Sequence, residues 1–172
     1  MTSCVLLRFV TFLITIAICY CILRTKFNVN KDKENRTYDS ITFDSKLEMK
    51  YYRDVLCPKV ESGEVTNVEL QKKYELQSGF LRNDKKVLPI TYVADFYVEY
   101  ADGRVEVIDT KGMPDSVAKL KRKLFWYKYP TIDYRWVTYI KKYGGWLDYE
   151  DAKALRKEAK HIKNKKEDTN NG

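Results

Sequence analysis

Residues 90–112, ITYVADFYVEYADGRVEVIDTKG, form the stretch that decides the predicted fold. Residues 91–100 are rich in Tyr, Val and Phe, and residues 105–110 are mostly β-branched. Both compositions are typical of strands in a packed sheet. The four residues between them, ADGR, are a hairpin turn signal. The stretch therefore predicts two antiparallel strands joined by a tight turn.

Each predicted strand carries one acid, Asp95 in the first and Asp109 in the second, and the turn decides whether they meet. A two-residue loop places the two aspartates on opposite faces of the sheet, because side chains alternate along a strand. A three-residue loop, with Gly103 left-handed in a bulge, makes them direct cross-strand neighbours and puts Lys111 on the same face. Both registers are open, and a shared site requires the longer loop.

Two carboxylates side by side on adjacent strands repel each other and destabilise a sheet, and a divalent cation would remove this cost. Mg²⁺ prefers hard oxygen ligands and commonly takes one or two carboxylates, with water and substrate phosphate in its other positions. A lysine beside such an ion can orient a water molecule or stabilise charge that develops on a phosphate. These residue types together indicate hydrolysis of a phosphodiester.

The same residues carry a resemblance to a known superfamily. Asp95, followed across a hairpin by Asp109-Thr110-Lys111, resembles the PD-(D/E)xK nuclease signature. Ala94 stands where the signature has proline, a position that takes no part in the metal chemistry. The chain further resembles an uncharacterised family of small phage-encoded, resolvase-like proteins assigned to that superfamily, through the stretches FDSKLEMKYY, YELQSGF, ITYVADF, VIDTKG and KLKRKLFWYKYP.

The resemblance covers residues 38–136 and implies both a fold and an activity. The fold is an α/β (α+β) restriction-endonuclease-like core, in which a mixed central sheet with an antiparallel hairpin is flanked by helices. The activity is Mg²⁺- or Mn²⁺-dependent endonucleolytic hydrolysis of DNA. Asp95 and Asp109 would hold the metal together with the Thr110 carbonyl, and Lys111 would position the attacking water. Resolvases share this core, so branched or recombination intermediates are candidate substrates, and homodimers are common among such nucleases.

A helix is predicted to begin at Asp44 or Ser45 and to end at Pro58, which cannot continue the helical hydrogen bonds. Ser45 and Glu48 in its first turn match a capping box, in which the glutamate has a purely structural role. In the nuclease families the corresponding helix supplies a third acid to the metal site, and the resemblance favours Glu48 for that role. Both interpretations stay open.

Residues 116–127 predict a second helix whose charged side chains are all positive. The residues expected to contact nucleic acid are Lys119, Lys121, Arg122, Lys123 and Tyr127. Lys123 and Tyr127 also resemble a Lys/Gln-x-x-x-Tyr element on this helix in several families of the superfamily. The face expected to pack on the core holds Val117, Leu120, Leu124 and Tyr127. The alternative is an ordinary solvated helix face.

Two further segments complete the predicted sheet. Residues 65–80 predict two short strands, or one strand kinked at Gln71-Lys72, beside the central hairpin. Gln71 and Gln77 could face a substrate groove, although glutamines on a strand surface are common. Residues 132–139 predict a strand parallel to an existing one, because a helical crossover precedes them.

An apolar segment opens the chain. Residues 5–23 are almost continuously apolar, a length that can just span a bilayer, and Lys and Arg residues follow them. This predicts a membrane anchor with the rest of the chain in the cytoplasm of the host cell. The alternative is that residues 1–27 are an extension from a misassigned start codon. In that case the protein is cytoplasmic without an anchor.

The other boundaries follow from composition. Residues 28–39 are polar and without periodicity, which predicts a flexible linker. Residues 40–162 form the predicted nuclease-like domain, and residues 148–162 predict its last helix. Residues 163–172 predict a disordered tail.

The charge of the chain narrows the class of partner. Its 172 residues include 32 Lys and Arg against 24 Asp and Glu, a formal net charge of +8, which favours nucleic acid first and anionic lipid second. A single histidine disfavours histidine or zinc catalysis, and the sequence has no glycine-rich phosphate loop. The main hypothesis is a DNA endonuclease. A non-catalytic nucleic-acid-binding module and a membrane-anchored interaction protein are the alternatives.

Overall fold

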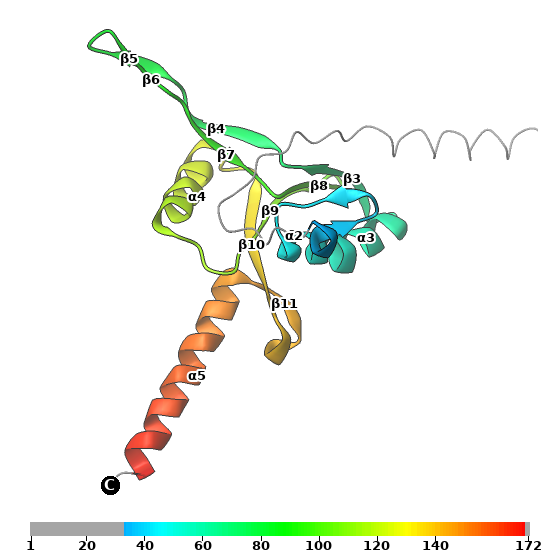
Figure 1. Ribbon diagram of the computed structural model, residues 1–172, viewed down its shortest axis with the longest axis vertical. Helices are drawn as coiled ribbons and strands as arrows, with labels where there is room; N and C mark the ends of the chain where they lie inside the picture. The colour runs from blue at the N-terminus through cyan, green and yellow to red at the C-terminus, as the bar shows by residue number, and fades with distance from the viewer. Residues whose placement is uncertain (1–32, 171–172) are drawn as a thin grey trace, which may run out of the picture.

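The computed structural model describes residues 33–170, which are organised around a five-stranded sheet (Figure 1). From edge to edge its strands are β11 (Gly145–Asp148), β10 (Asp133–Ile140), β9 (Val105–Thr110), β8 (Phe96–Tyr100) and β3 (Val65–Leu70). β9 and β10 run parallel, and the other neighbouring strands run antiparallel. Helices pack on both faces. The expected α/β (α+β) class, a mixed sheet flanked by helices, is confirmed.

One face of the sheet packs against a helix built of three consecutive parts. These are α2 (Lys46–Tyr51), a π-helical turn η2 (Tyr52–Leu56) and α3 (Cys57–Glu61). Met49 and Leu56 of this helix are buried against Phe96, Val98 and Ile108 of the central hairpin. Alternate residues of β8 and β9 supply this apolar face, because successive side chains of a strand point to opposite sides.

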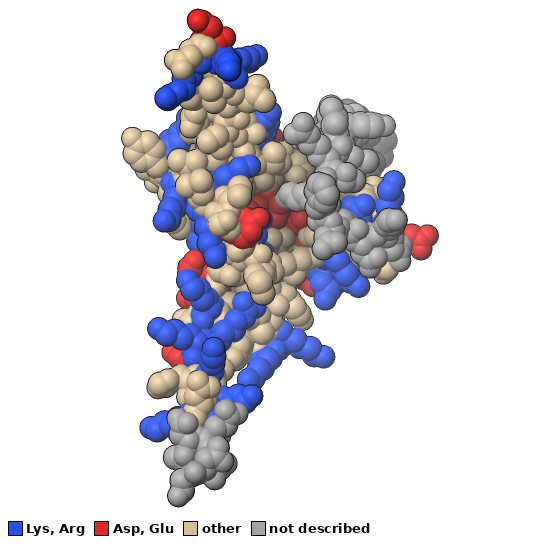
Figure 2. Space-filling view, turned by 60° about the vertical axis from the view of Figure 1, so that its left-hand side comes forward, with Lys and Arg blue, Asp and Glu red and all other residues tan. Residues whose placement is uncertain are grey.

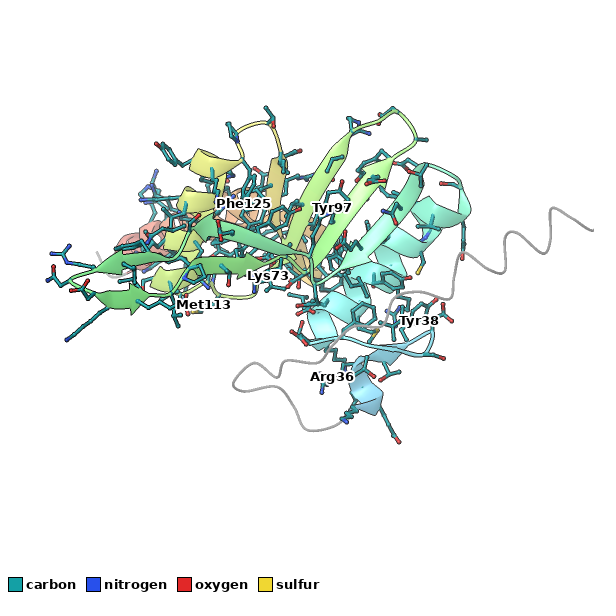
Figure 3. The ribbon with its side chains drawn as sticks, turned by 90° about the horizontal axis from the view of Figure 1, so that it is seen from above. Arg36, Tyr38, Lys73, Tyr97, Met113 and Phe125 are labelled. Carbon is teal, nitrogen blue, oxygen red and sulfur yellow. The ribbon has the colours of Figure 1, made fainter. Side chains whose placement is uncertain are left out.

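The opposite face is covered by α4 (Ser116–Lys128). Phe125 of α4, labelled in Figure 3, is completely buried. It contacts the rings of Tyr92 and Tyr134, with centroids 5.7 and 4.6 Å away. Val107 and Trp136 belong to the same buried cluster. The sheet therefore has two separate cores, and the second is mainly aromatic.

Pro58 does not end the first helix, contrary to the prediction, and the helix continues to Glu61. The π-helical turn before it explains the difference. Its wider turn bonds the Cys57 N–H to the Tyr52 carbonyl, five residues back. In a regular α-helix Pro58 would lack a donor for the carbonyl four residues back, and its ring would clash with that carbonyl. The π-helical turn has already shifted the hydrogen bonds to a spacing of five residues, so the helix continues through the proline.

The central hairpin, β8–β9, has the three-residue loop that a shared site requires. The Tyr100 N–H donates to the Arg104 carbonyl at 2.9 Å, and Gly103 between them has a φ of 84°, which glycine adopts without a steric cost. Extending the ladder by one residue places Asp95 opposite Asp109. The register that brings the two acids together is confirmed.

The stretch predicted as one strand over residues 91–100 is two strands that separate at Ala94-Asp95. The first of them leaves the central sheet and joins a two-stranded ribbon that projects from the body (Figure 1). We call residues 73–93 the arm. Its strands are β4 (Lys73–Gln77), which pairs with β7 (Ile90–Val93), and β5 (Phe80–Arg82), which pairs with β6 (Lys85–Val87).

Two other strand predictions are confirmed. The break at Gln71-Lys72 is present between β3 and β4, and β3 pairs with β8 of the central hairpin. β10 runs parallel to β9 after the α4 crossover. The 3₁₀ turn η3 (Lys141–Tyr143) and the edge strand β11 after it were not predicted from the sequence.

The described part of the predicted linker is structured. It forms a 3₁₀ turn, η1 (Glu34–Arg36), and β1 (Thr37–Tyr38), which pairs with β2 (Ile41–Thr42). Arg36 is buried and donates from Nη1 to the Phe43 carbonyl at 2.6 Å, and this contact fixes the segment to the body. The apolar segment 1–27 and residues 28–32 lie outside the described residues. Among those that are described, no helix combines the length and apolarity needed to cross a membrane.

The last helix is longer than expected. α5 (Tyr149–Asn170) runs through most of the segment predicted as a disordered tail. No glycine or proline occurs between residues 149 and 170, and Ala, Lys, Glu and Leu are strong helix formers, so nothing local ends the helix at residue 162. Figure 1 shows α5 projecting from the body at the end opposite to the arm.

Candidate active site

Asp95 and Asp109 lie together where the central hairpin meets the arm, and only 2% and 1% of their surfaces are exposed. The Asp95 Oδ2 accepts hydrogen bonds from the Thr110 N–H at 2.8 Å and the Thr110 hydroxyl at 3.1 Å. The Asp109 Oδ1 accepts one from the Asp95 N–H at 3.2 Å. These bonds hold two acids together where water is largely excluded and where repulsion between like charges is strong.

Lys111 supplies a positive charge beside the pair. Its Nζ lies 2.6 Å from the Asp109 Oδ2, and its side chain is 19% exposed. Burial alone would lower the pKa of Lys111, but the charges of Asp109 and then Asp95 outweigh it, so the pKa is raised above its ordinary value. The amine therefore stays protonated at neutral pH and is the counter-ion of the acids in this structure.

Tyr134 is a site residue that the sequence did not reveal. Its hydroxyl donates to the Asp109 Oδ2 at 3.1 Å and accepts a hydrogen bond from the Trp136 Nε1 at 2.7 Å. Burial, and then the charge of Asp109, raises the pKa of Tyr134, so the hydroxyl remains a donor. Tyr134 and Trp136 are two residues apart, so they lie on the same face of their strand. This spacing points to the site only once Trp136 is known to pair with Asp109 of β9.

Glu48 is buried at the start of α2, with 5% of its surface exposed. The Ser45 Oγ accepts a hydrogen bond from the Glu48 N–H at 3.1 Å and lies 2.8 Å from its Oε1 as a donor. The serine half of the predicted capping box is therefore present. The charge of Glu48 also contributes to raising the pKa of Lys111, which places the carboxylate in the same electrostatic environment as the two aspartates.

Gln71 connects Glu48 to the aspartates. Its Nε2 lies 3.5 Å from the Glu48 Oε2 as a donor, and its backbone N–H donates to the Asp95 carbonyl at 3.3 Å. Its φ of 55° is in the left-handed region, which costs energy for a residue other than glycine. The sequence indicated Gln71 only as a residue that could face a groove, and no motif marked this bridging position.

The paired carboxylates are donors of the kind that divalent metal ions bind. Two buried carboxylates held together suit a hard divalent cation that completes its coordination with water and phosphate. Within residues 33–170 no group of three or more His, Cys, Asp or Glu side chains is arranged to hold a metal, so Glu48 lies near the pair without completing a three-acid cluster. The Lys111 amine lies on an Asp109 oxygen, and a cation shared by the aspartates would displace it. The role of the Thr110 carbonyl stays a prediction.

Helix α4 presents a different side to the core from the one predicted. Phe125 is fully buried, whereas Val117 is 57% exposed, Leu120 56% and Tyr127 88%. Leu124 packs against the core as predicted, but Val117, Leu120 and Tyr127 do not, so the predicted core face was wrong for these three residues. Counting apolar residues by period placed the stripe on the solvent side, because it treated the arginine at position 122 as a surface residue.

Arg122 is only 8% exposed. Its guanidinium lies 4.4 Å from the ring centroid of Trp126 and 4.3 Å from that of Trp136, and its Nη1 is 2.9 Å from the Glu150 Oε1. A guanidinium stacks well on aromatic rings and can replace an apolar core residue. The structure therefore places Arg122 in a structural contact between α4 and α5, away from the predicted nucleic-acid surface.

The other predicted contact residues remain at the surface. Lys119, Lys123 and Tyr127 are exposed, and Lys121 is half-buried. Figure 2 shows lysines and arginines around a recess that has acidic side chains at its centre. Two cavities, of about 610 and 320 Å³, are open surface hollows whose linings do not include the aspartates. Neither hollow is therefore a pocket at the acid pair.

A sequence profile described as "Protein of unknown function (DUF1064)" matches residues 24–145. The chain belongs to this family. The matched region contains Glu48, Asp95, Asp109 and Lys111, together with the arm and α4, whereas α5 begins beyond it. No curated protein matches the chain. Family membership therefore groups the site and the arm as common parts of one domain without assigning them an activity.

Proposed function

We propose that this DUF1064 protein is a Mg²⁺- or Mn²⁺-dependent endonuclease of the PD-(D/E)xK superfamily that hydrolyses DNA phosphodiester bonds. The observation that carries the proposal is the buried pair of Asp95 and Asp109, opposed across a hairpin, with the Lys111 amine 2.6 Å from one of them. A fold gains nothing from burying two neighbouring carboxylates, because each loses hydration and repels the other. Such a cost is typical of an active site.

The residues divide the work of hydrolysis among them. Asp95 and Asp109 would hold the metal, which when bound supplies a Lewis acid and lowers the pKa of a coordinated water. Thr110 fixes the orientation of Asp95 through two hydrogen bonds, and Tyr134 fixes that of Asp109. Lys111, once it leaves the Asp109 oxygen, donates a hydrogen bond to the attacking water or to the phosphate oxygen on which charge develops.

DNA is the substrate that the surface charge favours. Lys119 and Lys123 of α4 are exposed and follow the site strand directly in the chain. Cations in this position contact phosphates regardless of base sequence. Branched and recombination intermediates are the finer substrate class within this proposal, and the expected cytoplasmic location, with or without a membrane anchor, stays a prediction.

A non-catalytic nucleic-acid-binding module is the second candidate. One observation favours it: the Lys111 amine already neutralises Asp109, so the pair has a counter-ion within the chain. In that reading the charges are structural and the exposed lysines still bind nucleic acid. The two candidates differ only in turnover.

The test is nicking of supercoiled plasmid by the full-length chain in detergent solution with Mg²⁺. Asp109→Asn keeps the shape of the side chain and removes the charge that a metal needs, and we expect it to lower the nicking rate by at least about a thousandfold, as EDTA does. Asp133→Asn, at an exposed position at the start of β10, is the matched control and should keep its activity. Equal nicking by wild type and Asp109→Asn would exclude the proposed site. Metal-independent binding without nicking would favour the second candidate.

A further inference from the structure

The outer part of the arm, β5–β6, has no core of its own. At its tip Phe80 is 47% exposed and Leu81 74%, and Leu88 beside the tip is 69% exposed. An isolated two-stranded hairpin is at best marginally stable in water, since a third strand or a packed helix is normally needed to cover one face. Among the described residues nothing covers the β5–β6 tip, so a partner outside the chain would explain its apolar side chains.

Charge decides which partner suits the tip. The turn and its flanks carry three cations, Arg82, Lys85 and Lys86, against one acid, Asp84. Two copies of the chain that met through their tips would bring six cations together, and this disfavours a homodimer at this surface. A polyanion such as nucleic acid would form ion pairs with these cations and could also contact the apolar side chains between them.

Cations and apolar side chains occur on both faces of the ribbon. Phe80 pairs with Val87, and Arg82 with Lys85, so these four residues share one face. Leu81 pairs with Lys86 on the other face. A ribbon with the same mixture on each side is suited to a partner that surrounds it, as the two walls of a groove do.

The arm begins at the site. The Ala94 N–H donates to the Lys72 carbonyl at 2.9 Å, and Asp95 follows directly, so the two strands of the arm separate beside the buried acids. Val93 lies ten positions after Asn83 at the turn, which corresponds to roughly 30 Å of extended strand. A phosphate at the acids therefore has the arm extending from it over a distance close to one turn of B-DNA, about 34 Å.

The tip and the middle of the arm have a defined backbone geometry. Asn83 and Asp84 have φ of 50° and 60°, the two positive values that a two-residue hairpin turn of this kind requires. At Gly79 an added Cβ would lie 3.1 Å from the Val87 carbonyl oxygen and 3.3 Å from the Pro89 Cδ, so the two strands approach closely there. Both features favour a preformed arm over one that folds only on binding.

We propose that the arm lies in the major groove of duplex DNA beside the phosphate that is held at Asp95 and Asp109. This inference rests on the proposed function and adds the form of the substrate, a duplex that extends to one side of the cut. The major groove, about 12 Å wide, admits a two-stranded ribbon directly, whereas the minor groove, about 6 Å wide, takes strands where the duplex is bent or widened. The cations contact the phosphate walls, and the apolar side chains contact base edges such as thymine methyl groups.

The test measures binding to a duplex of about 30 base pairs at several salt concentrations, in EDTA so that no cleavage occurs. Lys85→Ala with Lys86→Ala should reduce the salt dependence of binding by about two phosphate contacts, a slope change near 1.8. Lys141→Ala with Lys142→Ala removes two adjacent exposed lysines in η3, at the far side of the body, and is the matched control. An unchanged slope in the arm variant would overturn the inference.

A footprint identifies the groove. Methylation of guanine N7 reports the major groove, and we expect wild type to protect guanines within about ten base pairs on one side of the cut, the length the arm can reach. The arm variant should lose this protection. Protection confined to minor-groove positions, or a change in oligomeric state in the arm variant, would contradict the proposal. Protection without nicking would contradict the proposed hydrolysis and support the binding of the arm in the major groove. Nicking without protection would support hydrolysis and contradict the binding of the arm in the groove.

Discussion

Two halves of one stretch, β7 and β8, have similar composition and very different surroundings. β8 lies inside the five-stranded sheet between β3 and β9, and Phe96 and Val98 are completely buried. β7 has one partner, β4, and leads to a tip that is exposed on both faces. Asp95 lies at the change from one partner to the other. Strand-forming residues alone therefore do not decide which partners a strand takes, and the site lies where the partner changes.

The change of strand partner at Asp95 directs its backbone groups to other residues of the site. A residue in the middle of a sheet has both backbone groups committed to neighbouring strands. At Asp95 the ladder with β9 has ended, so its N–H donates to the Asp109 carboxylate and its carbonyl accepts from Gln71. The change of partner thus supplies backbone groups that orient side chains of the site.

The largest effect on the free energy of unfolding should come from the base of the arm, where it packs on α4, and a much smaller effect from its tip. Phe125→Ala removes a ring that packs against Tyr74, Tyr92 and Tyr134 at the base, and we expect the free energy of unfolding to fall by about 3–5 kcal/mol. Leu81→Ala at the tip should change it by less than about 0.5 kcal/mol. Chemical denaturation of both variants measures the difference, and similar losses would show that the tip is packed in solution.

A divalent ion should stabilise the junction of the two halves. Ca²⁺ or Mg²⁺ at a hundred times its dissociation constant should raise the free energy of unfolding by about 2.7 kcal/mol, because it binds the folded protein only. Asp109→Asn should abolish this gain, and Asp133→Asn should keep it. Thermal denaturation with and without the ion measures the effect. The same metal-induced shift in Asp109→Asn would place the ion elsewhere.

Alkaline pH should weaken the packed half. Tyr51 contacts Phe96 of β8, and burial raises its pKa to about 12 from 10. The folded pKa lies above the unfolded one, so the stability from the neutral phenol is present below about pH 10 and is lost as pH rises towards 12. The expected loss is about 2–3 kcal/mol, and Tyr51→Phe should lack it.

Tyr127→Phe is the control for this titration, since that ring is 88% exposed. Denaturation at a series of pH values between 9 and about 12 compares the three proteins, each against its own stability at the lower end. Other buried tyrosines add a loss of the same sign to all three. The difference between wild type and Tyr51→Phe therefore isolates Tyr51, and parallel curves for these two would contradict its raised pKa.

The smallest effect concerns the exposed side of α4. Lys119→Ala with Lys123→Ala should leave stability unchanged and weaken DNA binding equally for all sequences, with a salt slope lower by about 1.8. The Lys141 and Lys142 pair again serves as the control. Combined with the arm variant, the losses should add, because the two surfaces contact different phosphates. If only the α4 variant weakened DNA binding, the proposed contact between the arm and DNA would be contradicted.

Much of the fold could be read from local rules. The loop around Gly103, the strand patterns of the hairpin and the helical crossover to β10 each follow from turn chemistry or from periodicity. The rotation of α4 could not be predicted, because Arg122 is buried through rings contributed by Trp126 and Trp136, which a helical period does not include. The continuation past Pro58 depends on a π-helical turn that has no sequence signature.

The site shows the same division. Asp95, Asp109 and Lys111 could be named together because one hairpin carries all three. Tyr134 and Gln71 reach the same place from β10 and from the end of β3, and their roles depend on which strands become neighbours. Residues joined by one turn are accessible to sequence reasoning, whereas residues joined by sheet order require the structure.

The cap of α2 has a consequence for how position 48 can vary among relatives. Ser45 secures the first turn by accepting from a backbone amide, a group that every residue type except proline possesses. Exchanging the glutamate for glutamine or alanine would leave that anchor in place, so the helix imposes little selection on the side chain. Substitution patterns at this position should then follow the chemistry of the aspartate pair, and they offer an evolutionary record of whether a third acid is used.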